Sequence, residues 1–334
     1  MKTALFIGGT GTISSAITRR VAEDNDWKLY LLNRGTRNSV VPANVEVITA
    51  DVNDTERVKE KISDMQFDCV CDFIGFTEEH VCRDYNLFRG KTKQYIYISS
   101  ASAYQKPCRN YIITEQTPLE NPYWEYSRNK IQCENFLFDK YRNDHFPVTI
   151  VRPSHTYDER SVPLGVHGNR GSWQVVKRMM EGKPVIIHGD GTSLWTMTHN
   201  TDFAKGFIGL MGNAAAVGEA FQIMSDETLT WNQIYQSIAE AVGVELKAVH
   251  IASEYLATEG RQYDFLGGLI GDKANSVVFD TSKLKRYVPS FHAEVSFKEG
   301  IKTTIDNILN RKDLQTADEE FDEWCDRITA RFVR

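Results

Sequence analysis

The sequence predicts an α/β fold, a doubly wound parallel sheet with a smaller, interleaved C-terminal domain. Short apolar runs alternate with helical patterns through the first half of the chain. The segments between these runs are long enough for a helix, as parallel strands with right-handed crossovers require. With 334 residues, 41% of them hydrophobic and 25% charged, the chain is typical of a globular protein that buries a full core.

The expected strands of the sheet are short apolar runs, at 4–8, 28–33, 45–51, 68–75, 94–100, 147–153 and 219–225. Helical patterns lie between most of them, at 14–24, 55–65, 78–88, 126–141 and 202–213. Three further helices are expected near the end of the chain, at 231–242, 297–311 and 319–332. The stretches 158–171 and 188–196 are rich in Gly and polar residues and are expected to be loops.

Composition narrows the function classes. The net charge of −6, with no Lys/Arg-rich run, argues against a nucleic-acid partner. No apolar stretch approaches the roughly 20 residues that a bilayer requires, so no membrane association is expected. The six cysteines are scattered, which predicts reduced thiols in a cytoplasmic protein and no metal site. Cys69 and Cys71 are expected to point to opposite faces of one strand.

The first apolar run ends in the glycine-rich stretch Gly8-Gly9-Thr10-Gly11-Thr12-Ile13-Ser14, directly before a helical pattern. Glycines permit a tight turn and a close approach of a pyrophosphate to the backbone, and the helix start adds unpaired N–H groups. Ser14 stands where a third glycine is usual, and it is small enough for close helix–strand packing. The stretch therefore predicts dinucleotide binding through five residues, Gly8, Thr10, Gly11, Thr12 and Ile13; the alternative is a plain glycine-rich corner.

Two further strand ends are placed to read the cofactor. The second strand ends in Asn33-Arg34, at the distance expected for a ribose contact, and the third ends in Asp51-Val52, where an acidic residue can meet adenine. Asn33 would not repel a 2′-phosphate, and Arg34 could pair with one. NADP is therefore slightly favoured over NAD, although Arg34 could instead lie over adenine or point to solvent.

A candidate catalytic group follows. Tyr126 and Lys130 are four residues apart and share one helix face, where the ammonium is expected to lower the pKa of the phenol. Ser100 lies at the C-terminal end of a strand, where ligands of open α/β sheets bind, and could hold a substrate oxygen beside Tyr126. The alternative is a solvated Tyr–Lys pair that arises by chance.

Together these motifs resemble the short-chain dehydrogenase/reductase superfamily of the extended or atypical type, the NAD-dependent epimerase/dehydratase family, from Met1 to about Asp202. The resemblance implies a Rossmann fold, with Tyr126, Lys130 and Ser100 catalytic and Lys130 bonded to the nicotinamide ribose. Ser102 is a second candidate for the serine. Further cofactor contacts implied by the resemblance are Phe73, Ile74, Gly75, Ser99, Tyr126, Lys130, Pro153 and His155.

Departures from the family pattern bear on the substrate. Ala101 and Ser102 stand where sugar-nucleotide dehydratases carry an Asp-Glu pair, and Trp195 stands where related epimerases carry an arginine that grips the diphosphate. The substrate is therefore expected to be a small, uncharged, sugar-like molecule that contacts Ser102, His155 and Trp195. His155 could equally be a satisfied loop histidine.

The expected domains are a dinucleotide-binding Rossmann domain, 1–157 plus about 199–226, and a substrate-binding domain, about 158–198 plus 227–334. The expected function is that of an NAD(P)-dependent epimerase or reductase acting on a hydroxyl or ketone in carbohydrate metabolism, as a monomer or homodimer. The alternative is a non-catalytic atypical member that serves as a dinucleotide-dependent sensor or as an RNA- or protein-binding module.

Overall fold

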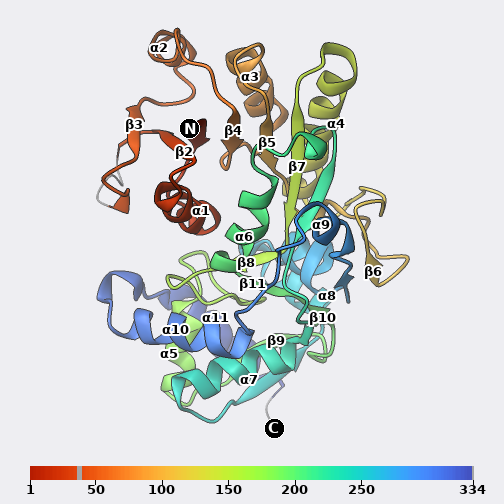
Figure 1. Cartoon of the computed structure of the whole chain (residues 1–334). Helices are drawn as coiled ribbons and strands as arrows, with labels where there is room; N and C mark the ends of the chain where they lie inside the picture. Colours follow the sequence, from red (N-terminus) through yellow and green to blue (C-terminus); the bar gives the residue numbers. More distant parts are fainter. Residues whose placement is uncertain (36–39, 333–334) are drawn as a thin grey trace.

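The computed structural model describes residues 1–35 and 40–332, and its centre is a seven-stranded sheet (Figure 1). All neighbouring strands are parallel, in the order β12-β7-β5-β4-β1-β2-β3. The strands are β1 Lys2–Ile7, β2 Trp27–Asn33, β3 Glu46–Thr49, β4 Cys69–Asp72, β5 Tyr95–Ile98, β7 Val148–Pro153 and β12 Ala220–Ile223. The predicted doubly wound parallel α/β sheet is confirmed, and the strand order reverses between β1 and β4.

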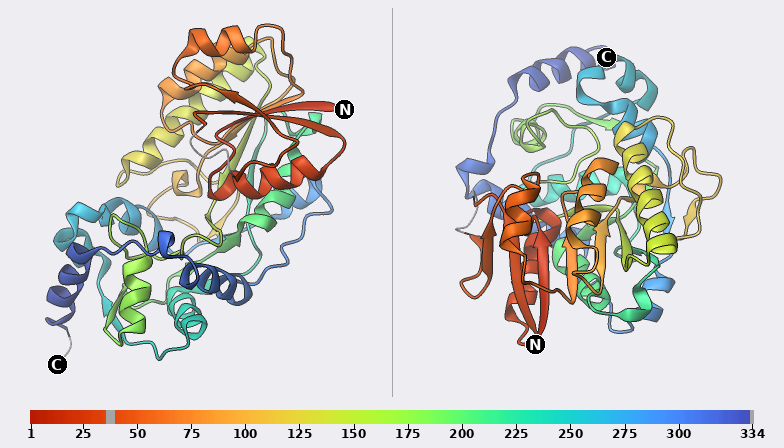
Figure 2. Two further views of the ribbon diagram at one scale, coloured as in Figure 1. Left: turned by 90° about the vertical axis from the view of Figure 1, so that its left-hand side faces the viewer. Right: turned by 90° about the horizontal axis from the view of Figure 1, so that it is seen from above.

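Helices cover both faces of this sheet (Figure 2). One face packs against α1 Thr12–Glu23 and α6 Asn200–Leu210. The other packs against α2 Thr55–Lys61, α3 Glu78–Phe88 and α4 Glu125–Asp144. Side chains alternate between the two cores, since Phe6 enters the first while Leu5 and Ile7 enter the second. Strands β4, β5, β7 and β12 are accordingly buried along their whole length, as expected for a parallel sheet covered on both faces.

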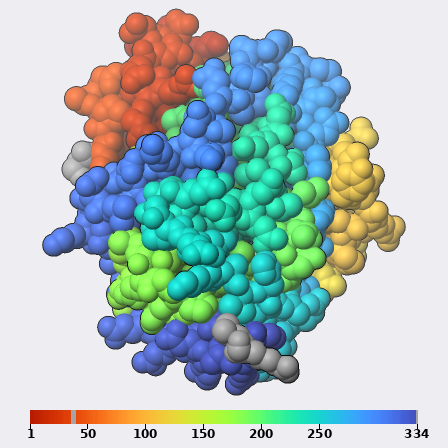
Figure 3. All heavy atoms as spheres, turned by 90° about the horizontal axis from the view of Figure 1, so that it is seen from below, coloured from red at the N-terminus to blue at the C-terminus, as the bar shows by residue number. Residues whose placement is uncertain are grey.

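A second lobe lies below the C-terminal ends of the strands in Figure 1 and has its own hydrophobic core. Its helices are α5 Trp173–Met180, α7 Trp231–Val242, α8 Ser253–Glu259, α10 Phe297–Leu309 and α11 Glu319–Thr329, with a π-helix, η5, at Leu266–Lys273. Helix α9, Ser282–Tyr287, packs beside β12. Figure 3 views the lobe from below, with α7 in teal near the centre.

Short elements complete the second lobe and the loops around it. These are β6 Ile112–Ile113, β8 His155–Tyr157, β9 Val185–His188, β10 Leu194–Trp195, β11 Met197–His199, β13 Leu229–Thr230, β14 Ala248–Ile251 and β15 Val278–Phe279, with 3-10 turns η2 Ala101–Ala103, η3 Ala214–Ala216, η4 Arg261–Tyr263 and η6 Lys312–Leu314. After the loop region that begins at 158, α6 and β12 return the chain to the central sheet. The division at 1–157 plus about 199–226, against about 158–198 plus 227–334, stays a prediction.

Local sequence signals account for several element boundaries. Helix α7 begins with a capping box in which the Thr230 side chain accepts from the Gln233 N–H, and it ends at Gly243 with φ of 83°. The structure has helices at the two expected ranges 78–88 and 231–242 with the same bounds. The π-helix Leu266–Lys273 lies in a segment for which the sequence predicted no element.

The expectation that Cys69 and Cys71 point to opposite faces of their strand is wrong. Their Sγ atoms lie 3.6 Å apart and both side chains are buried in the same core. Residues two apart on a strand share a face, because side chains alternate with a period of two. Among the described residues, no His, Cys, Asp and Glu side chains gather in the groups of three or more that a metal ion needs, and no helix is long and apolar enough to cross a bilayer.

Candidate functional site

The turn between β1 and α1 requires glycine at its first two positions. Gly8 has φ of 84°, and a Cβ there would lie 2.5 Å from Cγ2 of Ile74. A Cβ on Gly9 would lie 2.5 Å from Cδ2 of Leu31 in the neighbouring strand. A Cβ on Gly11, in contrast, would meet only the Ser14 hydroxyl, at 3.5 Å, so open space lies in front of this residue.

Ser14 ties this turn together, which explains why a serine can replace a third glycine. Its hydroxyl accepts from the Gly11 N–H at 2.9 Å and donates to the Gly8 carbonyl at 2.9 Å. The Thr18 hydroxyl adds a 2.7 Å hydrogen bond to the carbonyl of Gly9. The turn is therefore held by its own helix, with the positive end of α1 directed at the space in front of Gly11.

A cleft of about 830 Å³ opens beside this turn, at the reversal of strand order between β1 and β4. Of the residues predicted to contact the cofactor, only Gly75 does not line this cleft. Those that line it are Gly8, Thr10, Gly11, Thr12, Ile13, Asn33, Arg34, Asp51, Val52, Phe73, Ile74, Ser99, Tyr126, Lys130, Pro153 and His155. Sequence reasoning missed Asn53, Phe76 and His80, which also line it. The cleft and its glycine turn fit an elongated dinucleotide.

The far end of the cleft is formed by the ends of β2 and β3. The Asn33 side-chain oxygen accepts from the Gly35 N–H at 2.9 Å, while the Arg34 side chain is exposed. Asp51 is also exposed and accepts from the Asn53 N–H at 2.9 Å. Arg34, predicted to contact the ribose, and Asp51, predicted to contact adenine, therefore both have exposed side chains that line the cleft.

A guanidinium from the second lobe contacts the turn from outside. Nη1 of Arg160 donates to the Thr10 carbonyl and Nη2 to the Thr12 hydroxyl, each at 3.4 Å, while Arg160 also pairs with the buried Asp158. The Asn200 side-chain amide donates to the Thr12 carbonyl at 3.1 Å. The Arg160 contacts connect the glycine turn to the second lobe, whereas the Asn200 contact connects it to the start of α6. No local sequence pattern predicted either contact.

Tyr126 and Lys130 lie on α4, one turn apart. The buried Lys130 ammonium donates to the carbonyls of Gly75 and Ile98, each at 2.7 Å, and lies 5.8 Å from the centre of the Tyr126 ring. Burial lowers the pKa of Lys130 to about 8. Gly75 thus belongs to the site through its carbonyl, behind the cleft rather than in it.

The expectation that the neighbouring ammonium lowers the pKa of Tyr126 is not met in this structure. Burial raises the pKa of Tyr126 to about 12, and only the nearby Ser100 hydroxyl opposes that shift. The Lys130 ammonium is directed at two backbone carbonyls instead of at the phenol, which is the physical reason for the difference. The phenol is therefore protonated at neutral pH, able to donate to a substrate oxygen.

The serines after β5 form a hydrogen-bonded chain. The hydroxyls of Ser100 and Ser102 lie 2.9 Å apart, and the Ser127 hydroxyl donates to Ser102 at 2.7 Å. Ser99 donates instead to the buried Glu134 carboxylate, which also pairs with Arg152. Ser100 is thus the serine positioned beside Tyr126, with Ser102 behind it.

A second, smaller cavity of about 300 Å³ adjoins the large cleft. The two share Ser100, Tyr126, Pro153, Ser154 and His155, so Tyr126 stands where they meet. The predicted substrate residues Ser102, His155 and Trp195 all line the smaller cavity. Sequence reasoning missed its other polar and aromatic walls, which are Trp124, Asp272 and Lys273.

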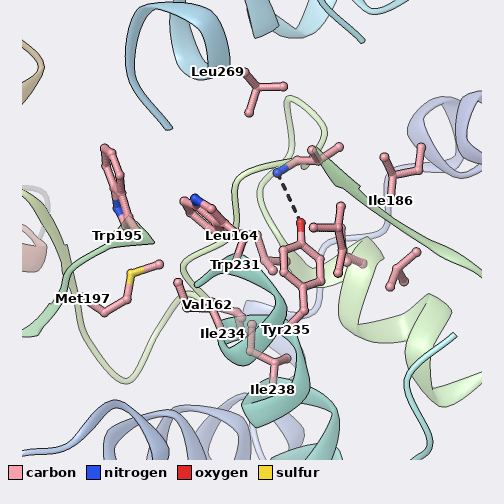
Figure 4. Close-up of a cluster of buried hydrophobic side chains, with 14 of the residues drawn as sticks. Val162, Leu164, Ile186, Trp195, Met197, Trp231, Ile234, Tyr235, Ile238 and Leu269 are labelled. Atoms are coloured by element: carbon pink, nitrogen blue, oxygen red, sulfur yellow. Dashed lines mark hydrogen bonds between the residues drawn. The ribbon is translucent and has the colours of Figure 1, made fainter. Parts of the chain in front are cut away.

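Trp195 and His155, which both line this cavity, each carry a buried polar atom without a partner among the described residues. Trp195 is 3% exposed, and its ring centre lies 5.9 Å from that of Trp231 in the hydrophobic core of the second lobe (Figure 4). Within residues 1–35 and 40–332, the buried Nε1 of Trp195 and Nδ1 of His155 have no hydrogen-bond partner. Burial, followed by the charge of Lys273, holds the pKa of His155 well below its usual value, so the imidazole is neutral.

Comparison with known proteins agrees with this fold. Residues 80–223 match the NAD dependent epimerase/dehydratase family. The 2′-dehydrokanamycin reductase of Streptomyces kanamyceticus is 21% identical over 86% of this chain and 79% of its own. The chloroplast stem-loop binding protein of 41 kDa b from Arabidopsis thaliana is 26% identical over 75% of this chain and 66% of its own.

A solved structure with the same fold is the UDP-glucuronic acid 4-epimerase of Bacillus cereus in complex with UDP-glucuronic acid and NAD. It superposes with a TM-score of 0.73 at 17% identity, over 92% of this chain and 99% of that one. The parallel sheet, the glycine turn at its reversal point and the match over residues 80–223 all agree with the resemblance to the NAD-dependent epimerase/dehydratase family that the sequence predicts.

Proposed function

We propose that this protein is an NAD(P)-dependent epimerase or reductase that acts on a hydroxyl or ketone of a sugar-like small molecule. The observation that carries the proposal is the position of Tyr126, which borders both the dinucleotide-sized cleft and the smaller cavity. A proton-carrying group at the junction of a cofactor site and a substrate site is what oxidation or reduction of an alcohol requires.

In this proposal Tyr126, Ser100 and Lys130 each have a separate role in the reaction at one substrate oxygen. The Tyr126 phenol donates a proton to a carbonyl oxygen, or takes one from a hydroxyl, and the Ser100 hydroxyl holds that oxygen beside it. The Lys130 ammonium, which lies 5.8 Å from the centre of the Tyr126 ring and bonds two backbone carbonyls, would offset part of the negative charge on the phenol when the proton leaves. A bound nicotinamide supplies or accepts the hydride.

The cofactor would lie along the large cleft, with its pyrophosphate at the Gly8–Ser14 turn. Asp51 and Val52 would contact adenine, and Arg34, exposed beside Asn33, would meet a 2′-phosphate. We therefore propose a slight preference for NADP over NAD. No nucleic-acid or membrane partner is proposed, and we propose that the protein acts in the cytoplasm as a monomer or homodimer.

The proposal is tested by cofactor titration followed by a substrate screen. Binding of NADPH or NADH is measured by fluorescence, and then cofactor turnover is followed with unactivated sugars, amino sugars and nucleotide sugars. The name of the Streptomyces relative, a reductase of a dehydrokanamycin, favours including aminoglycoside ketones. Turnover of a sugar-like alcohol or ketone is expected, whereas a protein that binds neither cofactor would contradict the proposal.

A second candidate function is RNA binding, favoured only by the name of the Arabidopsis relative, a stem-loop binding protein. The net charge of −6 opposes it, because RNA affinity depends largely on positive charge. An electrophoretic mobility shift with stem-loop RNA, with and without NADP, separates the candidates. Salt-sensitive binding that requires the cofactor, in a protein without turnover, would favour the non-catalytic alternative.

A further inference from the structure

The last two residues of the π-helix Leu266–Lys273 line the smaller cavity together with Tyr126. π-helical segments are rare in proteins, and those that occur often lie at functional sites. This one is seated against Trp124 through its glycines, since a Cβ on Gly267 would lie 2.0 Å from Cδ1 of the indole. Any larger residue there would push the π-helix away from Trp124, and with it the cavity wall.

Several hydrogen bonds fix the π-helix relative to the candidate catalytic serines. The Asn121 side-chain amide donates to the Ser102 carbonyl at 2.8 Å and to the Gly271 carbonyl at 2.7 Å. The Lys273 carbonyl accepts from Nε1 of the buried Trp231 at 3.1 Å. The last turn of the π-helix is thus held in a defined position close to Ser102, through the shared Asn121 amide.

Asp272 and Lys273 carry the only pair of opposite charges on the walls of this cavity among the described residues. Their side chains are 10% and 14% exposed, and Nζ lies 3.3 Å from Oδ2 and 5.7 Å from the centre of the Trp124 ring. Both charges influence other residues that line the cavity: burial mainly raises the pKa of Tyr126 and Asp272 adds to this, while burial mainly lowers the pKa of His155 and Lys273 adds to that.

The charges and the aromatic walls define a ligand chemistry. A carboxylate accepts hydrogen bonds from hydroxyls and an ammonium donates them, and the two charges cancel, so a neutral ligand is favoured. Tryptophan faces supply flat apolar surface for the C–H side of a ring, with an N–H at the edge. A diphosphate, in contrast, would be repelled by Asp272 and would find one lysine in place of a bidentate arginine.

We propose that Asp272 and Lys273 are specificity-determining residues that bind neighbouring hydroxyls of a free, polyhydroxylated ring, a sugar or cyclitol without a nucleotide diphosphate. Asp272 accepts from one hydroxyl and Lys273 donates to the next, while Trp124 and Trp195 bound the ring. This inference rests on the proposed function, because it assigns the smaller cavity to the substrate of the same site.

Binding to the NADPH-loaded protein tests the inference. The probes are methyl β-D-glucopyranoside, myo-inositol and UDP-glucose, each followed by saturation-transfer NMR and calorimetry. The variants are Asp272→Asn, Lys273→Gln and the double substitution, which leaves no unpaired charge. Lys298→Gln is the matched control, because Lys298 pairs with Glu240 on the surface and is 74% exposed. NADPH binding and thermal unfolding report folding for every variant.

The expected result is that at least one of the two free rings binds and that UDP-glucose binds no more tightly. Each single substitution should raise the dissociation constant of the free ring by about tenfold or more, as expected for a lost hydrogen bond to a charged group. NADPH binding, and ring binding by the Lys298→Gln control, should stay unchanged. Three results would overturn the inference: UDP-glucose binds more tightly than either free ring, neither ring binds although NADPH does, or the folded variants bind the ring as well as the parent. Failure to bind NADPH would overturn the proposed function itself.

Discussion

The Lys130 ammonium donates a 2.7 Å hydrogen bond to the carbonyl of Gly75, the residue that follows the end of β4 by three positions. That carbonyl is held in place by Asp72, whose buried carboxylate accepts from the N–H groups of Ile74 and Gly75, each at 2.9 Å. A Cβ on Gly75 would lie 2.1 Å from that carboxylate, so the turn is compact. Asp72 is therefore connected to Lys130 through one backbone carbonyl.

Replacing Asp72 by Asn should make Lys130 lose its proton at lower pH. The negative charge of Asp72 raises the pKa of Lys130 against the larger effect of burial, so its removal lets the pKa fall further below about 8. The measurement is the pH dependence of the NADPH dissociation constant between pH 6 and about 9. Asp68→Asn, just before β4, is the control, because the Asp68 side chain is 27% exposed and pairs with Lys93 instead; identical pH profiles for both variants would refute the connection.

Replacing Asp84 by Asn should remove a pH dependence of stability. Burial, followed by the charge of Asp72, raises the pKa of Asp84 from 3.8 to about 8. The folded protein then holds a proton that the unfolded chain releases, so the free energy of unfolding falls as pH rises from about 4 to about 8, by at most about 1.4 kcal/mol per pH unit. Denaturant midpoints at pH 5 and pH 8 check this; a variant with the same decline as the parent would speak against it.

Replacing Gly11 by Val should abolish or strongly weaken dinucleotide binding. The added side chain would enter the space in front of the turn, where the Cβ itself meets only the Ser14 hydroxyl, at 3.5 Å. The fold should therefore tolerate the substitution while the pyrophosphate site is filled. Calorimetry with NADH and NADPH, beside thermal unfolding, is the measurement, and undiminished binding by the folded variant would show that the cofactor lies elsewhere.

Replacing Arg34 by Gln should weaken NADPH binding while leaving NADH binding nearly unchanged. The Arg34 side chain is exposed at the end of β2, free to pair with a 2′-phosphate that NADH lacks. Loss of one charge-assisted contact corresponds to about tenfold in the dissociation constant. Equal weakening of both cofactors would place Arg34 over adenine instead.

The sequence predicts the sheet and many of the residues that line the large cleft, because those residues lie in regular strand–turn–helix units. The turn at Gly8 and the strand ends at Asn33 and Asp51 follow from local pattern alone, and all line the cleft. The helix that carries Tyr126 and Lys130 was also expected, although it begins and ends a few residues further out.

The part of the smaller cavity that Trp124, Asp272 and Lys273 line could not be predicted in this way. The π-helix lacks the 3.6-residue period that identifies an α-helix in a sequence. Its glycines are explained only by their contact with Trp124, which is distant in the sequence. The direction of the Tyr126 pKa shift was missed for a related reason, since burial by other segments outweighs any effect of its helical neighbour. Both features depend on tertiary contacts between distant parts of the chain.

The central claim is that Tyr126 carries the proton in the reaction on the substrate, and Tyr126→Phe tests it most directly. The substitution keeps the ring between the two cavities and removes only the phenolic oxygen. The measurement is the single-turnover rate of NADPH oxidation, or NADP reduction, with the sugar-like substrate found by the screen. The account predicts a rate lower by about 100- to 10,000-fold with unchanged cofactor binding; a rate near that of the parent would contradict it.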